Sequence, residues 1–295
     1  MRIAVIGTSG QLGFDLARLL PTRGHELLPF AGRADLDITD ASAVDEMLDR
    51  RRPEALINTA AFHNVDLCER EADAAYRTNV VAVREMARAC ERRGILFVQI
   101  GTDYVVEGAP ANKPVPESAP VHPNSIYSLT RFGGDCMTLA HAPTQGYVIR
   151  SCGLFGVAGC KLKGGLNFVD TMIAAARAGK PLRVVDDQTV APTPTDDLAA
   201  QVALVLEMGP SKAPPGLYHA VSHGEVTWYA FARRALELAN VPHQIEPVPS
   251  SAYAAPAKRP QYSVLDNAKL RELHLDIMRP WQESLERYVG MKYPR

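Results

Sequence analysis

A glycine-rich loop close to the N-terminus, Gly7-Thr8-Ser9-Gly10-Gln11-Leu12-Gly13, is the most informative stretch of this sequence. Residues 2–6 before it have the apolar composition of a buried strand, and residues 11–20 carry apolar side chains at helical spacing. Glycines at such a junction allow a tight turn, and the free N–H groups of the helix N-terminus attract a pyrophosphate. We therefore predict a dinucleotide-binding turn, with an ordinary strand–helix turn as the alternative; its residues are Gly7, Gly10, Gln11, Leu12 and Gly13.

Alternation of strands and helices continues through the first half of the chain. Apolar runs typical of buried strands occur at residues 2–6, 26–30, 55–59, 96–100 and 146–150, and amphipathic stretches typical of helices at 11–20, 41–51, 72–93 and 125–140. Such alternation predicts an α/β fold, a doubly wound parallel sheet of the Rossmann type with helices on both faces.

Beyond about residue 151 the pattern becomes less regular. We predict a dinucleotide-binding Rossmann domain at residues 1–152, to which strands and helices from about 182–221 return. Residues 153–295 should form a smaller, interleaved substrate-binding lobe. Lys161 and Lys163, in a glycine-rich loop of this lobe, could meet a diphosphate or simply face solvent.

Composition excludes several classes of protein. The 295 residues have a net charge of −1, so there is no basic field to attract nucleic acid. No apolar run approaches the roughly 18–20 residues that span a bilayer, which argues against a membrane protein. The five cysteines are odd in number and widely spaced, which argues against disulfides and zinc and favours a cytoplasmic location.

The residues after the second predicted strand bear on the choice between NAD and NADP. No acidic residue stands at the strand end to bind a ribose 2′-hydroxyl, and Arg33 could bind a 2′-phosphate or lie in a solvated loop. Asp37 could bond an adenine edge, with Ile38 beside it, while Thr39 or Asp40 could cap the next helix.

Candidate catalytic side chains follow at the fourth strand and the next helix. A Thr102 hydroxyl at the C-terminal end of a parallel strand could hydrogen-bond a substrate carbonyl or alcohol. Tyr127 and Arg131, four residues apart, share one helix face, although this spacing is also common on protein surfaces. The fixed cation should stabilise the phenolate, lower the pKa of Tyr127 and allow proton exchange near neutral pH.

Further motifs match a known family. They are Leu36-Asp37-Ile38-Thr39-Asp40, Asn58-Thr59-Ala60-Ala61-Phe62, Val65-Asp66, Asn79-Val80, Gly101-Thr102-Asp103-Tyr104-Val105, Val184-Val185-Asp186-Asp187-Gln188, Arg259-Pro260 and Tyr262-Ser263-Val264-Leu265-Asp266. With the GxxGxxG loop, they make the chain resemble the dTDP-4-dehydrorhamnose reductases. These are extended short-chain dehydrogenases that reduce a 4-keto group on a nucleotide-linked deoxysugar with NAD(P)H.

The resemblance implies roles for individual residues and a two-lobed fold with substrate in the cleft. Thr102 and Tyr127 would be catalytic, and Asp103 and Tyr104 would border the substrate. The implied cofactor contacts are Ala60, Ala61 and Phe62, with Asn79 near the same site. Some family members form metal-linked dimers; this chain could form a homodimer, but we assign no metal ligands.

Two positions depart from the family pattern. Arg131 stands where the family has lysine, which raises the question of activity. Arg150-Ser151-Cys152-Gly153 replaces a stretch that often ends in an aromatic residue, so a ring that could pack on the sugar is missing at Gly153. We therefore expect weak use of dTDP-4-dehydrorhamnose.

The favoured function is an NAD(P)H-dependent reductase of a nucleotide-activated 4-keto-deoxysugar, with NADP or NAD as cofactor. Two alternatives are a non-catalytic dinucleotide-binding regulatory subunit and an epimerase or dehydratase on the same scaffold. His63 follows the third predicted strand and could face the cleft, whereas His219 lies within a predicted strand and is expected in the core. The histidines have no convergent partners at ligand spacing, so we predict no catalytic metal.

Overall fold

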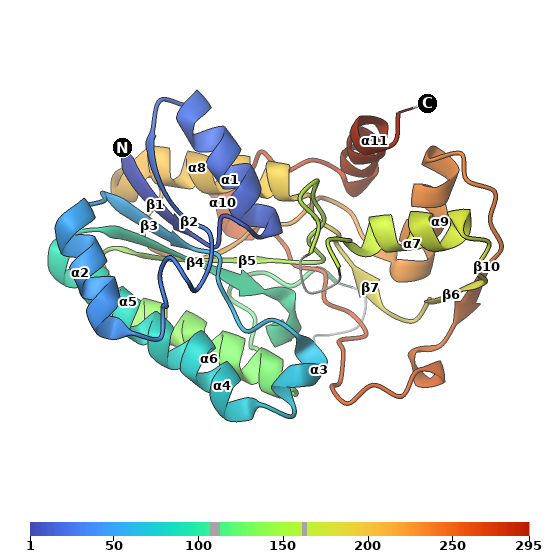
Figure 1. Ribbon diagram of the computed structural model, residues 1–295, viewed down its shortest axis with the longest axis horizontal. Coiled ribbons are helices and arrows are strands. Elements are labelled where there is room, and N and C mark those ends of the chain that lie inside the picture. Colours follow the sequence, from blue (N-terminus) through green and yellow to red (C-terminus); the bar gives the residue numbers. More distant parts are fainter. Residues whose placement is uncertain (107–112, 161–163, 295) are drawn as a thin grey trace.

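The computed structural model describes residues 1–106, 113–160 and 164–294. Within these ranges the main element is a parallel sheet in the order β2-β1-β3-β4-β5-β8 (Figure 1). Its strands are β1 (Arg2–Ile6), β2 (Glu26–Phe30), β3 (Ala55–Asn58), β4 (Leu96–Thr102), β5 (Gly146–Ser151) and β8 (Gly216–His219). The chain leaves β1 toward one edge for β2 and then crosses to the other side for β3, so the predicted doubly wound sheet is confirmed.

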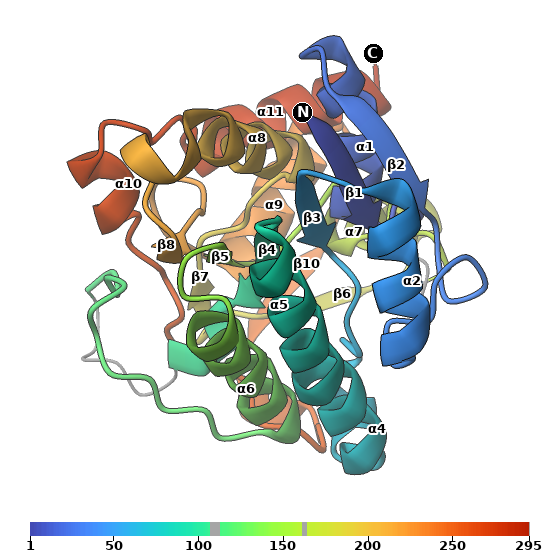
Figure 2. The same ribbon diagram turned by 90° about the vertical axis from the view of Figure 1, so that its left-hand side faces the viewer.

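Helices cover both faces of this sheet, as Figure 2 shows from the side. Alternating side chains of β1 point to opposite faces: Ile3 and Val5 join one apolar cluster, Ala4 and Ile6 the other. The first face is covered by α1 (Gln11–Thr22), α8 (Thr195–Lys212) and α10 (Ala268–Glu272). The second is covered by α2 (Ala41–Arg51) and α5 (Ala82–Arg93), with α6 (Ile126–His141) packed beside α5.

The stretch expected to form one helix at 72–93 is less regular than predicted. It contains α4 (Ala72–Tyr76), a π-helical turn η1 (Arg77–Val81) and α5. Two short helices, α3 (Val65–Cys68) and the 3-10 turn η2 (Asp103–Val106), follow β3 and β4 at the carboxyl edge of the sheet.

A smaller group of elements lies beside that edge, on the right in Figure 1. Its helices are α7 (Phe168–Arg177), α9 (Trp228–Leu238), the 3-10 turn η4 (Ser250–Ala252) and α11 (Trp281–Lys292). Its strands are β6 (Leu182–Val185), β7 (Thr189–Val190), β9 (Val226–Thr227) and β10 (Ile245–Val248). A third apolar cluster around Phe155, Phe231 and Trp281 holds these helices together.

The range predicted to return to the main sheet divides between the two groups. Strand β8 pairs with β5, and α8 packs against α1. Strand β6, by contrast, pairs with β10 in the smaller group, so the prediction is wrong for residues 182–185. None of the described helices is long and apolar enough to cross a membrane.

Candidate active site

The turn after β1 is built around glycines that leave no room for side chains. Gly7 has φ +89°, and its N–H donates to the Phe30 carbonyl at 2.8 Å. A Cβ on Gly7 would lie 2.5 Å from Thr59 Oγ1, and a Cβ on Gly13 would lie 2.1 Å from the Gly7 carbonyl oxygen. The tight strand–helix turn is therefore present, while dinucleotide binding there stays a prediction.

The N-terminus of α1 follows directly on this turn. Gly10 precedes the helix, donates its N–H to the Gly7 carbonyl at 2.9 Å, and has no side chain to cap the helix. Leu12, in the first turn, is buried among apolar neighbours. Gln11 Oε1 is buried and finds no hydrogen-bond partner among the described residues. The free helix end suits a pyrophosphate, and the amide oxygen can accept from a ligand hydroxyl or amide.

A cavity of about 150 Å³ extends from the glycine turn toward the end of β2. Six of the residues predicted to contact the cofactor line it: Gly7, Arg33, Asp37, Ile38, Ala60 and Ala61. The Arg33 side chain is 81% exposed and forms a 2.7 Å ion pair with Asp37. Its guanidinium is thus held at the mouth of the cavity, where a 2′-phosphate could reach it. Asp40, as predicted, caps α2 by accepting from the Ser42 N–H.

Asn79 organises the cofactor side of the site without lining this cavity. Its Oδ1 accepts from the Phe62 N–H at 2.9 Å, and its Nδ2 donates to the Phe62 carbonyl at 3.0 Å. The same Nδ2 donates to Thr130 Oγ1 at 3.1 Å, so Asn79 joins the loop after β3 to helix α6. The side chain is 2% exposed, and its contacts hold the loop after β3 against α6.

The candidate catalytic residues meet at the carboxyl end of β4. Thr102 ends this strand beside Ser151 of β5, and Tyr127 lies in the first turn of α6. The Tyr104 ring packs edge-on against Tyr127, with centroids 5.3 Å apart. One turn further along, buried Arg131 donates from Nη2 to the Ile100 carbonyl, while its Nε has no partner among the described residues.

The pKa of Tyr127 differs from the sequence-based expectation. Burial raises this pKa, and the charge of Arg131 and a hydrogen bond with Thr102 offset the effect only in part. The expected net fall was therefore wrong, because the phenol loses more hydration than one cation restores. A raised pKa favours the protonated phenol.

Asp103 is the centre of a buried hydrogen-bond cluster. Its carboxylate accepts from Thr102 Oγ1 at 3.1 Å, Cys152 Sγ at 3.1 Å and Ser263 Oγ at 2.6 Å. Burial raises the pKa of Asp103 despite these bonds. Asp103 lines a cavity of about 710 Å³ between the two groups of elements. Its carboxylate oxygens are occupied by hydrogen bonds with Thr102, Cys152 and Ser263.

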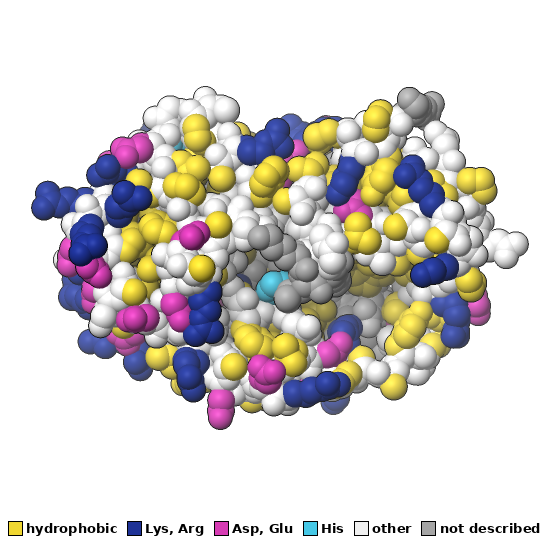
Figure 3. All heavy atoms as spheres, viewed as in Figure 1, with side chains coloured by type: hydrophobic (Ala, Val, Ile, Leu, Met, Phe, Trp, Pro, Cys, Tyr) yellow, Lys and Arg dark blue, Asp and Glu magenta, His cyan; other side chains and the backbone are white. Residues whose placement is uncertain are grey.

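A cavity of about 710 Å³ opens where the two groups of elements meet, and Figure 3 shows this face hollowed between them. From the sheet side Gln11, His63, Asp66 and Tyr104 line it; from the other side Phe168, Arg183, Gln188, Trp228, Tyr253 and Arg259 do. Gln11 belongs to the first turn of α1, so the cavity reaches the glycine turn. One recess thus connects a dinucleotide-type turn with Asp103 and Tyr104.

Gly153 does line this cavity, but the space beside it is filled. A Cβ built on Gly153 would lie 3.0 Å from Cη2 of Trp228 and 3.3 Å from the Pro192 Cα. Gly153 itself contributes no ring, but the Trp228 ring of α9 lies beside it. Gly153 also has φ +53°, which favours glycine.

Several residues of the site were missed by analysis of the sequence. Trp228, Phe168 and Arg259 line the cavity, and Ser263 donates to Asp103. The motif containing Arg259 and Ser263 was noted without a role, because a chain contact 160 residues from Asp103 has no local signal. Trp228 was given no role, because the direction of its side chain depends on tertiary packing.

The two histidines behave differently. His63 lines the cavity, with Nε2 4.0 Å from Cys160 Sγ. His219 is fully buried, and its Nδ1 lies 3.1 Å from the Val115 carbonyl, as expected of a core residue. Lys161 and Lys163 lie outside the described residues. In the part of the chain that the structure describes, no group of three or more His, Cys, Asp or Glu side chains could hold a metal ion.

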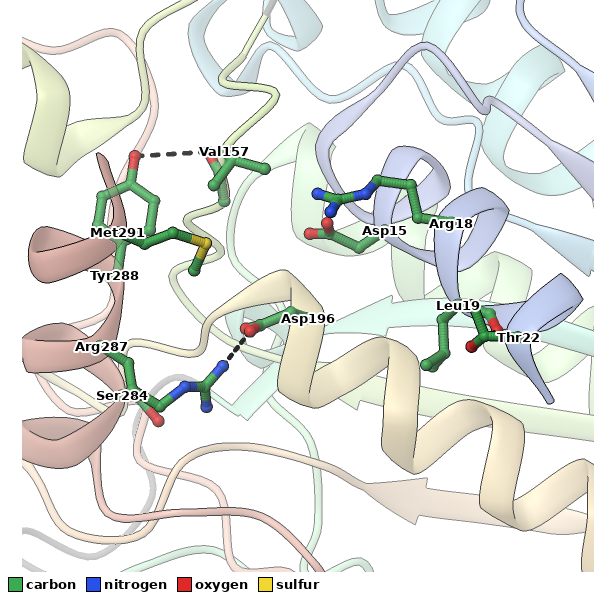
Figure 4. Close-up of a pocket in the computed structure, with 11 residues that line it drawn as sticks. Asp15, Arg18, Leu19, Thr22, Val157, Asp196, Ser284, Arg287, Tyr288 and Met291 are labelled. Carbon is green, nitrogen blue, oxygen red and sulfur yellow. Dashed lines mark hydrogen bonds and ion pairs between the residues drawn. The ribbon is translucent and has the colours of Figure 1, made fainter.

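A third cavity, of about 470 Å³, lies between α1, α8 and α11 (Figure 4). Asp15 and Arg18 come from α1, and Arg287 of α11 forms an ion pair with Asp196 of α8. Its lining shares no residue with that of the 710 Å³ cavity, so it is separate from the catalytic candidates.

Known proteins resemble this chain over nearly its whole length. A family model described as RmlD substrate binding domain matches residues 1–293. A dTDP-4-dehydrorhamnose reductase from Streptomyces griseus is 37% identical over 286 residues, covering 96% of this chain and 91% of the relative. A dTDP-4-keto-6-deoxy-D-glucose reductase from Streptomyces niveus is 36% identical over 286 residues, covering 96% and 95%.

A solved structure shows the same architecture. The dTDP-4-dehydrorhamnose reductase of Bacillus anthracis, in complex with NADP, has a TM-score of 0.90 and 30% identity, covering 98% of this chain and 99% of that chain. The resemblance inferred from the motifs is therefore confirmed, and the chain belongs to the dTDP-4-dehydrorhamnose reductase family.

Proposed function

We propose that this protein is an NAD(P)H-dependent reductase of a 4-keto-deoxysugar linked to dTDP, with dTDP-4-dehydrorhamnose as the first candidate substrate. The observation that carries the proposal is that the 710 Å³ cavity extends from Gln11, at the glycine turn, to Asp103 and Tyr104. Asp103 accepts a hydrogen bond from Thr102, and the Tyr104 ring packs against Tyr127. The reductases from Streptomyces species and the NADP complex of the Bacillus anthracis protein support it.

The cofactor would lie along the carboxyl edge of the sheet. We assign the pyrophosphate to the turn of Gly7, Gly10 and Gly13 and to the N-terminus of α1. The adenosine end would occupy the cavity of Asp37, Ile38, Ala60 and Ala61, with Arg33 at a 2′-phosphate. On this basis NADPH should bind better than NADH, and calorimetry with both measures the preference.

Reduction of the sugar also needs a proton. A dinucleotide held in this way would supply the hydride that the keto carbon needs. Tyr127 would give its proton to the keto oxygen, and Thr102 would orient that oxygen through its hydroxyl. Arg131 would bind the nicotinamide ribose through its unpartnered Nε–H and bias the phenol electrostatically.

The two parts of the chain would bind different ligands. Residues 1–152 would hold the dinucleotide, and residues 153–295 would supply most of the substrate wall. Five free cysteines are in keeping with a reducing cytoplasm. We also propose a homodimer, which sedimentation equilibrium would test.

The test is consumption of NADPH with dTDP-4-dehydrorhamnose and dTDP-4-keto-6-deoxy-D-glucose, followed by absorbance. Tyr127→Phe should lower the rate by about two to four orders of magnitude, the range for a lost proton donor. Tyr76→Phe, at an exposed tyrosine of α4, is the matched control. Equal rates for wild type and Tyr127→Phe would refute the proposed role.

The same assay separates the alternative functions. A regulatory subunit would bind NADPH without turnover of any sugar nucleotide. An epimerase or dehydratase would convert the sugar without net consumption of NADPH. Chromatography of the products beside the absorbance record distinguishes the three.

A further inference from the structure

Trp228 presents an aromatic ring to the large cavity. It is the first residue of α9 and lies among the residues that line this recess. The ring packs against Phe168, with centroids 4.6 Å apart, and against Phe231 at 6.2 Å. Phe231 is fully buried whereas Trp228 is only partly buried. The ring therefore rests on an aromatic base and keeps a surface toward the cavity.

Gly153 is the neighbour that makes room for this ring. The Cβ that any other residue would carry at this position would lie 3.0 Å from Trp228 Cη2 and 3.3 Å from the Pro192 Cα. The Cα of Pro192 is a backbone atom and cannot easily move aside. The side chain of Trp228 would therefore have to move. A larger residue at 153 would therefore require the Trp228 ring to shift from its present position.

The ring lies at the reacting end of the cavity. Gly153 follows Ser151 by two residues, and Ser151 is the β5 partner of Thr102 in the sheet. Arg183, a cation able to meet a nucleotide diphosphate, lines the cavity from β6, whereas Arg259 lies against Tyr104, near the catalytic candidates. A ligand whose keto group reaches Thr102 would thus place its sugar ring, rather than its base, beside Trp228.

We propose that Trp228 is the aromatic wall of the sugar subsite, and that Gly153 and Trp228 form a matched pair that determines which sugar fits. The proposal rests on the proposed function, since it names the residue that contacts the sugar. Apolar C–H groups of a deoxysugar pack well on an aromatic face, whereas a nucleotide without the sugar gains nothing from this ring.

Fluorescence offers a direct test, because the chain has only two tryptophans, Trp228 and Trp281. Trp281 is buried behind Phe231, so Trp281→Phe leaves one reporter at the cavity. Titration of this variant with dTDP-rhamnose, the reduced sugar nucleotide, should change its emission, and dTDP alone should change it much less. Equal responses at saturation, checked by calorimetry, would overturn the sugar contact.

Substitutions give a second test. Trp228→Ala should raise the KM and Kd for the sugar nucleotide by about tenfold, with NADPH and dTDP affinity unchanged, and Trp228→Phe should restore part of the loss. A purely structural role predicts instead parallel losses for all three ligands. The Kd measurements need no turnover, so they distinguish failure of this proposal from failure of the proposed reductase activity.

A third test moves the aromatic ring from position 228 to position 153. Gly153→Trp in the presence of Trp228 should abolish binding of the sugar nucleotide, and Gly153→Trp with Trp228→Gly should regain a measurable part. Backbone strain at position 153 is the same in both variants, so the comparison isolates the two rings. A double variant no better than Gly153→Trp alone would overturn the matched pair.

Discussion

Arg131 keeps the charge of the family lysine but not its chemistry. One guanidinium nitrogen donates to the Ile100 carbonyl, and guanidinium groups in proteins keep their protons, so this side chain cannot release one during turnover. Electrostatic help to Tyr127 should therefore survive, while any proton relay through this side chain is lost.

Arg131→Lys should accordingly keep or raise kcat. The compact ammonium can direct a donor at both ribose and phenol, and it can exchange its proton. Steady-state kinetics with one accepted keto-sugar measures the effect, with Arg88→Lys at an exposed site of α5 as control. A loss of more than about tenfold in kcat would show that the bond to the Ile100 carbonyl is required instead.

His219 should make stability depend on pH. Burial lowers its pKa to about 3, with Arg150 contributing and Asp266 opposing. Between pH of about 6.5 and 3 the unfolded chain binds a proton that the folded chain does not. The free energy of unfolding should therefore fall as pH falls below 6.5, by up to about 1.4 kcal/mol per pH unit.

Denaturant unfolding at several pH values measures this dependence. In His219→Asn, whose amide can still donate to the Val115 carbonyl, the slope in this window should be smaller. His122→Asn, at an exposed position, should leave the slope as in the wild type. A slope identical in wild type and His219→Asn would contradict the prediction.

Among the elements, the turn from β1 into α1 can be tested at one glycine. Gly13 cannot be used, because its Cβ would meet the Gly7 carbonyl oxygen and disturb the fold. Gly10 has φ −87°, and a Cβ there meets only the same oxygen at 3.3 Å. Gly10→Glu should therefore fold yet lose NADPH binding, since its carboxylate would occupy the anion site.

Calorimetry with NADPH checks this expectation. Gly290→Glu, at an exposed glycine of α11 with open space around it, is the matched control and should bind normally. Unaltered NADPH affinity in a folded Gly10→Glu protein would remove the cofactor from this turn.

The elements also show how far the sequence could predict the structure. The strands of the main sheet were predicted to within two residues at each end, because buried parallel strands have continuous apolar runs. The π-helical turn at Arg77–Val81 was missed, since the extra residue leaves both flanking segments amphipathic. Strand β6 was placed in the wrong sheet because an apolar run does not identify its partner.

The sequence likewise predicted some residues of the candidate site and missed others. Thr102, Tyr127 and Arg131 were found because short-range motifs contain them, and the structure brings them together. The roles of Trp228 and Ser263 were not found, because their contacts join segments far apart in the chain. Burial of Tyr127, which sets the direction of its pKa, is likewise a property of tertiary packing.

At the scale of the whole molecule, polar contacts tie the two parts across the cavity. Arg259 donates from Nη2 to Asp66 Oδ2 at 2.8 Å, and this bond lowers the pKa of Asp66. Both side chains are partly exposed, so the pair should contribute less than about 1 kcal/mol to stability. Its effect should instead fall on the shape of the substrate site.

Asp66→Asn and Arg259→Gln should therefore each raise the KM for the sugar nucleotide several-fold, with little change in NADPH affinity. Their effects should not add, because both remove one contact. Asp49→Asn, which breaks the Arg93 ion pair within the sheet part, is the control and should leave KM unchanged. Fully additive effects on KM would show that the two residues act independently.

The return of late segments to the first sheet has a consequence for protein synthesis. Strand β8 covers the edge of β5, and Leu270 and Leu275 join the same apolar cluster as Ile3. At about 5–20 residues per second, a ribosome would leave the early strands without this cover for on the order of tens of seconds. Nascent chains should therefore expose an apolar sheet face and an open strand edge during translation, and should be clients for chaperones until the C-terminal segments emerge.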